Sequence, residues 1–360
     1  MTSQIRVIDT GLREGRKNIA FDQAMVTLRQ QGLIPDTLRF IHFQPTALVG
    51  RHQDLGLELN LDACAEAGVG TARRMTGGGA IYLDPGQLGW ALVCSRTLFD
   101  GGDLGTVTRR ICEAAAAGLS TLGIDARYRP RNDIEVGGRK ISGTGGYFEG
   151  DVLMFQGTVL VDLDPAMIGR VLNVPKAKLT RHALDDAAQR ITTLAALLGA
   201  PPPLAEVQEA LAKGLAEELD AGLFSDLPTA QEEALAQSAY EQEIGTDEFV
   251  LEIDGADRIA GIRVGHHLGP GGLVRAHIRL DGPRGDRVRE ILFTGDYFVT
   301  PPRVVFDLEA ALRQSPTSAL PQAIRTYFDS LPAGGMLSIG AEDFIAAAEA
   351  AIAAEPVDAE

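Results

Sequence analysis

Three consecutive glycines behind a pair of arginines are the feature that most constrains this chain. They stand in the run Arg73-Arg74-Met75-Thr76-Gly77-Gly78-Gly79-Ala80. Glycine permits backbone angles that other residues avoid, and it lets a ligand approach the main chain without an intervening Cβ. The run therefore predicts a basic loop whose backbone N–H groups bind phosphate oxygens, with Arg74 adding a charge-assisted bond. A purely structural turn is the alternative explanation.

A lone lysine follows further along the chain, in the segment Gly138-Arg139-Lys140-Ile141-Ser142-Gly143. The flanking glycines predict a hairpin turn that leads into a strand. A lysine held in this way can supply a fixed positive charge to a developing phosphate or acyl oxyanion, whereas most lysines are simply solvated. Asn132 and Asp133, just upstream, could hold a metal-bound phosphate or a ribose, or could serve only as a turn or strand-end cap.

Several other kinds of site are absent from the sequence. Neither the Gly-x-x-x-x-Gly-Lys-Ser/Thr phosphate loop nor the Gly-x-Gly-x-x-Gly dinucleotide pattern occurs, so a hydride-transfer enzyme is disfavoured. There is no Gly-x-Ser-x-Gly nucleophile elbow and no histidine–carboxylate pattern for zinc.

Length and composition describe an ordinary globular protein. The 360 residues exceed the usual size of one domain, which predicts two. A net charge of −16 opposes a nucleic-acid-binding surface. The chain's three cysteines, Cys64, Cys94 and Cys112, are odd in number and lie in apolar surroundings, which favours reduced side chains. The sequence shows no signal-peptide core and no long apolar stretch, so we expect a cytoplasmic protein without a membrane segment.

The hydrophobic pattern divides the chain into two parts. Helical and extended segments alternate over the first part: we expect helices at 18–30, 61–67 and 104–122, the first capped by Asn18, and strands at 38–43, 47–50, 80–83, 88–95 and 152–162. Residues 184–242 form a polar, acidic helical stretch, either a connector or a partner-facing surface. A small α+β unit follows, with strands expected at 249–253, 258–264, 273–280 and 287–293, and helices at 304–313, 321–330 and 341–353.

Residues 18–164 resemble the catalytic domain of the lipoate–protein ligase family. The resemblance rests on the two segments quoted above and on Asn18-Ile19-Ala20-Phe21-Asp22-Gln23-Ala24, Gly50-Arg51-His52-Gln53, Asn132-Asp133-Ile134 and Gln156-Gly157-Thr158-Val159-Leu160. It implies a mixed-sheet α/β (α+β) domain of the biotin/lipoate ligase type, related in shape to class II synthetases. Gly271-Gly272-Leu273-Val274-Arg275 and Gly295-Asp296-Tyr297-Phe298 resemble the small α+β C-terminal accessory domain of the larger bacterial members. We therefore expect a catalytic domain over residues 1–245 and an accessory domain over residues 246–360.

The resemblance also implies a two-step, ATP-dependent reaction. Lipoate, or octanoate, is activated to acyl-AMP with Mg²⁺ screening the phosphates, and the acyl group then passes to a lysine of a carrier protein. By this resemblance Lys140 bridges the acyl carbonyl and the phosphate, and Asn132 and Asp133 lie near the metal, with Asp133 its ligand. Gly77 and Gly78 shape the acyl slot. The nucleotide contacts implied are Arg74, Gly79, Ala80, Ile81 and Tyr82.

Two residues depart from the family pattern. Leu83 stands before Asp84 where many members have histidine, and Gln156 replaces the histidine of a His-Gly-Thr strand. Both changes alter polar groups around the site, so acyl specificity or carrier choice could differ. The carriers implied are lipoyl domains of 2-oxoacid dehydrogenases, the glycine-cleavage H protein, or a specialised H-like protein.

Two other functions stay open on the sequence alone. The first is an ATP-independent octanoyl or lipoyl transferase of the same superfamily. Cysteine-dependent versions carry a cysteine shortly before the strand that leads to the lysine, whereas this chain has Tyr128-Arg129-Pro130-Arg131 there. The second is a non-catalytic carrier-binding protein, which should tolerate loss of Lys140.

Overall fold

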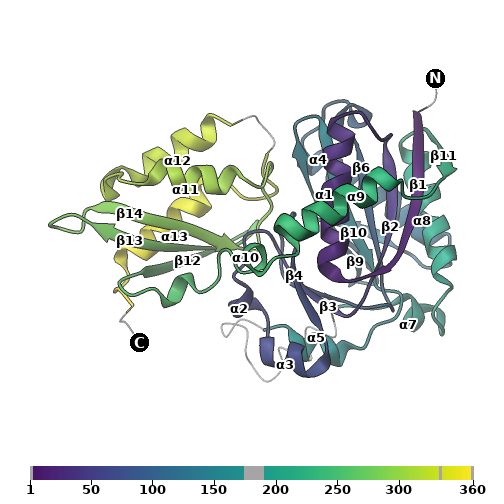
Figure 1. Ribbon diagram of the computed structural model, residues 1–360, viewed down its shortest axis with the longest axis horizontal. Helices are drawn as coiled ribbons and strands as arrows, with labels where there is room; N and C mark the ends of the chain where they lie inside the picture. Colours follow the sequence, from purple (N-terminus) through teal and green to yellow (C-terminus); the bar gives the residue numbers. More distant parts are fainter. Residues whose placement is uncertain (1–2, 174–189, 332–334, 358–360) are drawn as a thin grey trace.

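The computed structural model describes residues 3–173, 190–331 and 335–357. It has two lobes, a large N-terminal domain and a smaller one, residues 263–353, which we call the accessory domain (Figure 1). The lobes meet beside β4 (Gly70–Arg73) and α10 (Asp247–Val250). Within these described residues no helix has both the length and the apolar composition needed to cross a bilayer.

The N-terminal domain is built on a mixed sheet. Its strand order is β11 (Ala221–Ser225), β1 (Ser3–Arg13), β2 (Thr37–Phe43), β6 (Leu88–Ser95), β10 (Val152–Val159), β9 (Arg139–Glu149), β8 (Asp133–Val136) and β7 (Arg127–Arg129). The first three strands pair in parallel, and the remaining neighbours pair antiparallel. The fold is therefore the mixed-sheet α/β class that the sequence predicts.

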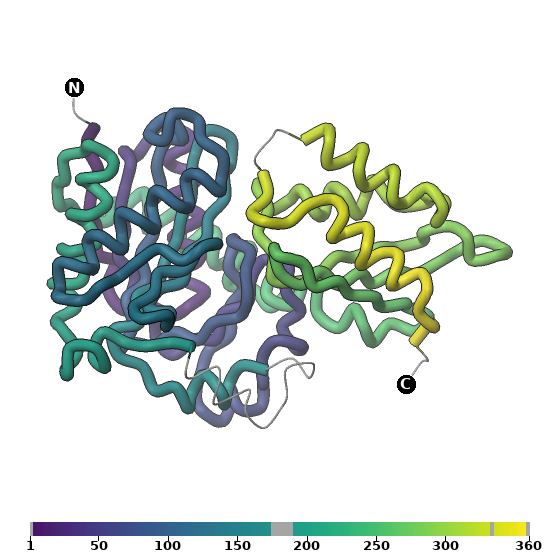
Figure 2. Tube along the Cα trace, turned by 180° about the vertical axis from the view of Figure 1, so that it is seen from behind, coloured from purple at the N-terminus to yellow at the C-terminus, as the bar shows by residue number. Residues whose placement is uncertain are grey.

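Helices cover both faces of this sheet. Helices α1 (Gly15–Gln30) and α9 (Ala230–Ala239) lie on one face, and α4 (Leu104–Ser120) and α8 (Leu204–Glu218) lie on the other (Figures 1 and 2). On the α4 face Trp90 packs directly over Gly157 of the neighbouring strand, because a Cβ at that glycine would come within 2.3 Å of the indole. The shorter helices of this domain are α2 (Leu55–Glu58), α3 (Leu61–Ala67), α5 (Pro165–Val171) and α7 (Leu194–Leu198), with a π-turn at Tyr240–Ile244 and 3₁₀ turns at Arg96–Phe99 and Ala256–Arg258.

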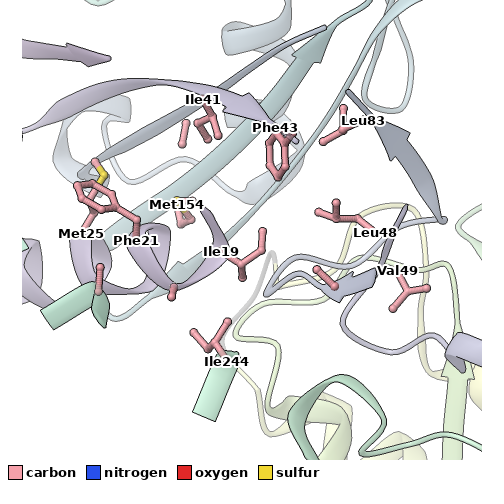
Figure 3. Close-up of a cluster of buried hydrophobic side chains, with 14 of the residues drawn as sticks. Ile19, Phe21, Met25, Ile41, Phe43, Leu48, Val49, Leu83, Met154 and Ile244 are labelled. Carbon is pink, nitrogen blue, oxygen red and sulfur yellow. The ribbon is translucent and has the colours of Figure 1, made fainter. Parts of the chain in front are cut away.

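A small second sheet faces the α1 side of the large one. Its order is β4, β3 (Thr46–Val49) and β5 (Ile81–Leu83). Figure 3 shows the apolar side chains that converge here from α1, β2, β3 and β5, including Ile19, Phe43, Leu48 and Leu83. The glycine-rich loop connects β4 to β5, so the fold places it at the rim of this apolar cluster.

The accessory domain has its own hydrophobic core. An antiparallel sheet of β12 (Arg263–Gly269), β13 (Gly272–Asp281) and β14 (Arg287–Gly295) packs against three helices, α11 (Val304–Leu312), α12 (Leu320–Asp329) and α13 (Ala341–Ala353), with a 3₁₀ turn at Thr317–Ala319. The strands and helices expected from residue 273 onward are confirmed.

Three local predictions were wrong. A strand was expected at residues 258–264, but Ala256–Arg258 form a 3₁₀ turn and β12 begins only at Arg263. Helix α1 begins at Gly15, and Asn18 lies inside it, where its side chain donates to the His42 carbonyl and accepts from Arg39. Residues 249–253 were expected to be a strand, but Phe249 lies in helix α10, because Thr246 caps that helix by accepting from the Phe249 N–H. The first residues of the acidic stretch predicted at 184–242, residues 184–189, lie outside the described part of the chain.

Candidate active site

One cavity of about 390 Å³ brings together every site residue that the sequence singled out. It lies between the large and small sheets, and residues from Arg74 to Tyr82 meet Asn132, Asp133 and Lys140 in its wall. Apolar side chains of α1, β2 and β3 line another part, among them Ile19 and Phe43 (Figure 3). The cavity therefore combines a polar, charged wall with an apolar slot, which suits an amphipathic carboxylic acid.

Lys140 is fixed by its backbone as well as by its side chain. Gly137 and Gly138 turn the β8–β9 hairpin at φ +57° and +79°, a region that favours glycine. The Lys140 N–H donates to the Arg190 carbonyl at 2.8 Å, and its own carbonyl accepts from Thr192 N–H at 2.9 Å. Its Nζ lies 2.7 Å from Asp133 Oδ1. The predicted hairpin position of this lysine is thus confirmed.

Asp133 is held between two cations. Its Oδ2 accepts from Arg129 at 2.6 Å, while Oδ1 pairs with Lys140. Burial by itself raises the pKa of the Asp133 carboxyl, but the charges and hydrogen bonds of Lys140 and Arg129 outweigh burial and hold this pKa below its usual value. Asp133 is therefore ionised at neutral pH and orients the Lys140 ammonium.

Asn132 is hydrogen-bonded to strand β9. Its side-chain amide donates to the Thr144 carbonyl, and Thr144 Oγ1 donates back to the Asn132 carbonyl at 2.9 Å. The side chain thereby fixes the entry to β8, which matches the strand-end cap considered for this residue. Asn132 still lines the cavity.

The carboxylates near Lys140 do not form a metal cage. Across the described residues no group of three or more His, Cys, Asp or Glu side chains is placed to share a metal ion. Both oxygens of Asp133 already bind cationic side chains. The described residues thus offer no cage of several protein ligands for Mg²⁺, and Asp133 as a single ligand to a nucleotide-bound Mg²⁺ stays a prediction.

Arg74 is a second cation of the cavity, and it is buried. Its Nη2 donates to the carbonyls of Gly77 at 2.7 Å and Gly79 at 2.8 Å, and its Nε donates to Thr76 Oγ1 at 3.1 Å. Burial lowers the pKa of the guanidinium to about 10, which leaves it charged at neutral pH. Its Nη1 is buried without a hydrogen-bond partner among the described residues. A buried, charged donor of this kind favours a bound anion.

The glycine loop also contacts the accessory domain. The Gly78 N–H donates to the Tyr297 carbonyl of the accessory domain at 3.2 Å. A Cβ at Gly77 would lie 2.0 Å from that carbonyl oxygen, and one at Gly78 would lie 2.5 Å from Cζ of Phe298. The accessory domain therefore needs both glycines in order to dock, which the sequence did not reveal.

The two departures from the family pattern both lie at the cavity. Leu83 adds an apolar wall. Gln156 accepts from Thr76 Oγ1 at 3.3 Å and donates to Asp22 Oδ2 at 2.5 Å. Asp22 in turn forms a buried ion pair with Arg39 at 2.5 Å. Gln156 thus joins the glycine loop to helix α1 through two hydrogen bonds, one of them to the Asp22 carboxylate.

Two further site residues were missed by sequence reasoning. Gly143 lies beneath the Lys140 side chain, and Phe298 enters the cavity from the accessory domain. Gly143 stood within a quoted motif, so its spacing from the lysine was a usable signal. Phe298 also stood within a quoted segment, but nothing in that segment indicated its place at the cavity, since its partners lie in a different domain.

The model of one protein family decides where this chain belongs. The model of the lipoyl protein ligase A/B catalytic domain matches residues 14–216. The chain belongs to this family. Among its relatives, the octanoyltransferase LipM of Symbiobacterium thermophilum is 31% identical over 272 residues, covering 69% of this chain and 98% of the relative. Lipoate-protein ligase A subunit 1 of Thermoplasma acidophilum is 30% identical over 244 residues, covering 65% and 91%. The family thus includes both transferases and ligases.

Two solved structures share the fold. A lipoate-protein ligase A bound with ATP superposes with a TM-score of 0.60 at 28% identity, covering 70% of this chain and 99% of that one. LipL1 of P. falciparum, in complex with lipoate, reaches a TM-score of 0.72 at 16% identity, covering 92% and 95%. The second likeness concerns the fold alone and spans the accessory domain as well.

Proposed function

We propose that this protein is an ATP-dependent lipoate–protein ligase that activates lipoate or octanoate to acyl-AMP and transfers the acyl group to a carrier lysine. The observation that carries the proposal is the chemistry of the cavity wall, which offers two fixed cations, Arg74 and Lys140, but no thiol. Fixed cations stabilise the charge that develops at phosphorus and at an acyl carbon. The ATP-bound relative supports the nucleotide part of the proposal.

The first step would form the acyl-adenylate, and each polar residue of the cavity would have a role in it. In the first step a carboxylate oxygen of lipoate attacks the α-phosphate of ATP, the bond to the β-phosphate breaks, and pyrophosphate leaves. Lys140 would bridge the carboxylate and the α-phosphate, and Arg74 would bind phosphate through its unpartnered Nη1. The remaining nucleotide contacts would come from Gly79, Ala80, Ile81 and Tyr82. Catalysis here rests on positioning and fixed charge.

The second step makes an amide and releases AMP. The carrier's neutral lysine amine attacks the acyl carbon of the mixed anhydride, the bond from that carbon to the phosphate oxygen breaks, AMP leaves, and the proton lost by the amine passes to the departing phosphate or to water. Asp133 acts as a positioning residue, since it holds the Lys140 ammonium at 2.7 Å. Magnesium would arrive with the nucleotide phosphates, whose charge it screens, rather than on a protein cage.

A transferase mechanism that uses a cysteine nucleophile is disfavoured by where the cysteines lie. All three cysteines of the chain are buried, and none lines the cavity. Cys112 contacts a cavity residue, with its Sγ 3.2 Å from Oγ1 of Thr144, but burial raises the pKa of its thiol to about 12. Burial raises the pKa of the Cys64 and Cys94 thiols as well. A nucleophilic thiolate is therefore disfavoured at every cysteine of this chain.

The proposed partner is a lipoyl-carrier protein: a lipoyl domain of a 2-oxoacid dehydrogenase, the glycine-cleavage H protein or an H-like carrier. The proposed location is cytoplasmic. A non-catalytic carrier-binding role would leave the Lys140–Asp133 pair and the buried Arg74 without a purpose.

Intact-mass spectrometry of an apo carrier tests the proposal. The carrier is incubated with this protein, lipoate and Mg²⁺, with and without ATP. A gain of one lipoyl group that requires ATP, and is lost in Lys140→Ala, is the expected result. Transfer from an octanoyl-carrier without ATP would establish the transferase instead. Binding of the carrier without either product would establish the non-catalytic role.

A further inference from the structure

Phe298 of the accessory domain reaches into the cavity of the N-terminal domain. Its ring is wedged between two glycines from different elements. A Cβ at Gly145 of β9 would lie 2.4 Å from Cε1 of the ring, and one at Gly78 would lie 2.5 Å from Cζ. Any larger residue at either position would therefore displace the ring.

The position of the ring is fixed by several backbone contacts around it. The Phe298 carbonyl accepts from Leu337 N–H at 3.2 Å, and the Gly295 N–H donates to the His52 carbonyl at 2.8 Å. Thr300 Oγ1 accepts from the Phe148 N–H at 2.5 Å and donates to its carbonyl at 2.9 Å. The segment from 295 to 300 is thus held at both ends, and the side chain between them has a defined place.

Phe298 and Lys140 occupy the same face of strand β9. Lys140 Nζ lies over Gly143, 2.7 Å from where a Cβ would be, and the ring of Phe298 lies over Gly145. Residues two apart on a strand point to the same side, about 7 Å from each other. A carboxylate held by Lys140 could therefore extend its chain along this face and reach the aromatic ring.

We propose that Phe298 is a specificity-determining residue that ends the acyl slot and selects medium-length acyl chains over longer ones. The inference rests on the proposed function, because it takes the ligand to be an acyl acid bound at Lys140. The slot has no Cβ at Gly143 or Gly145, so its floor on β9 is smooth. The ring lies over Gly145, two residues along that floor from the glycine beneath Lys140, and it comes from the accessory domain. The acyl slot is incomplete without that domain.

Equilibrium binding tests this role without requiring turnover. Isothermal titration calorimetry measures the affinity of the full-length protein for hexanoate, octanoate, lipoate, decanoate and dodecanoate, with Mg²⁺ and an α,β-methylene ATP analogue that blocks adenylation. The wild-type protein should prefer octanoate and lipoate. Phe298→Ala should improve the dodecanoate-to-octanoate affinity ratio at least tenfold, and Phe298→Leu, which keeps an apolar contact between the domains, should improve it less.

Phe306→Ala is the matched control. Phe306 also lies in the accessory domain and stacks near His52 and Arg51, with centroid and cation distances of 5.4 and 4.6 Å, but it does not line the cavity. Its loss should leave the chain-length preference unchanged. An unchanged preference in both Phe298 variants, or the same shift in Phe306→Ala, would overturn the role of Phe298 while leaving the ligase proposal standing. A wild-type protein that binds none of the acids would overturn both.

Discussion

The side chain of Lys140 crosses directly over Gly143, so closely that a Cβ at that glycine would lie 2.7 Å from Nζ. Gly143 also pairs with Asp133 on the neighbouring strand, the residue whose carboxylate holds the ammonium group. One glycine thus makes room for the Lys140–Asp133 pair. Glycine is needed at position 143 because the Lys140 side chain occupies the space that a Cβ would fill, and not because a turn requires it there.

Replacing Gly143 by alanine should therefore damage activity more than stability. The added methyl group meets the flexible end of a lysine, which can move aside, so the unfolding temperature should change little. The displaced ammonium group would lose its alignment with Asp133, and kcat should fall about tenfold or more. Gly70→Ala is a suitable control, because a Cβ there comes no closer than 3.7 Å to its neighbours. Equal activity in the two variants would contradict this role of Gly143.

Lys140 and Asp133 should differ in how strongly they affect catalysis. Lys140→Ala removes the fixed charge, and kcat should drop by about 10²–10³-fold. Asp133→Asn leaves the lysine in place but weakens its orientation, so a smaller loss is expected. Steady-state kinetics of carrier lipoylation separates the two. A larger loss in Asp133→Asn than in Lys140→Ala would show that Asp133 is more than a positioning residue.

Arg74→Lys should weaken the site although the charge is kept. A lysine cannot donate to both the Gly77 and Gly79 carbonyls in the planar fork that the guanidinium provides. We expect the KM for ATP to rise about tenfold or more, because the glycine loop loses its internal support. Arg139→Lys, at an exposed position of the same hairpin as Lys140, should leave the KM for ATP as it is. An unchanged KM in both variants would argue against nucleotide binding at Arg74.

A reciprocal carboxyl pair joins the N-terminal domain to the segment that leads into the accessory domain. Asp54 Oδ2 accepts from the Gly255 N–H, and Asp254 Oδ1 accepts from the Gly56 N–H, both at 2.8 Å. Burial, followed by the hydrogen bond and negative charge of Asp254, raises the pKa of Asp54 to about 7. The folded state therefore holds a proton that the unfolded chain releases near its ordinary pKa.

The stability of the protein should consequently fall as pH rises through this range. The contribution of Asp54 is fully present below about pH 4, the pKa of an unfolded aspartate, and is lost as pH approaches 7. Asp54→Asn should remove this part of the pH dependence. Urea unfolding of both proteins between pH 5 and pH 8 checks the expectation. Parallel stability curves for the two proteins would show that Asp54 does not titrate in this way.

Thr300→Val should loosen the contact between the domains. The hydroxyl of Thr300 binds both the N–H and the carbonyl of Phe148, and valine leaves these buried groups unsatisfied. The expected loss is about 1–3 kcal/mol. Hydrogen exchange at residues 295–300, compared with exchange in the β12–β14 sheet, should show the effect at the contact first. Faster exchange throughout the accessory domain would instead indicate that its own core is destabilised.

Much of the site could be predicted from the sequence because it is local. The glycine run and the Lys140 hairpin impose their backbone geometry within a few residues, so their spacing carries the information. All the residues of these motifs that were predicted to contact the ligand line the cavity. Strand and helix positions followed from hydrophobic periodicity for the same reason, as for helix α3, whose observed range Leu61–Ala67 is the one predicted.

The rest depends on contacts between distant segments. Gly77 and Gly78 accommodate Tyr297 and Phe298, and nothing near these glycines in the sequence marks that relationship. Asn18 has the composition of a helix cap, yet the buried Arg39 captures its side chain inside the helix. Residues 249–250 have strand-like side chains, but the Thr246 cap and the acidic first turn of Asp247 and Glu248 favour a helix.

We propose that this protein makes an acyl-adenylate without a covalent enzyme intermediate. Lipoate-dependent exchange of labelled pyrophosphate into ATP, measured with no carrier protein present, tests it most directly. We predict exchange that requires both lipoate and Mg²⁺, is lost in Lys140→Ala, and survives alkylation of accessible thiols. No exchange by the wild-type protein, together with acyl transfer between carriers in the absence of ATP, would identify it as a transferase instead.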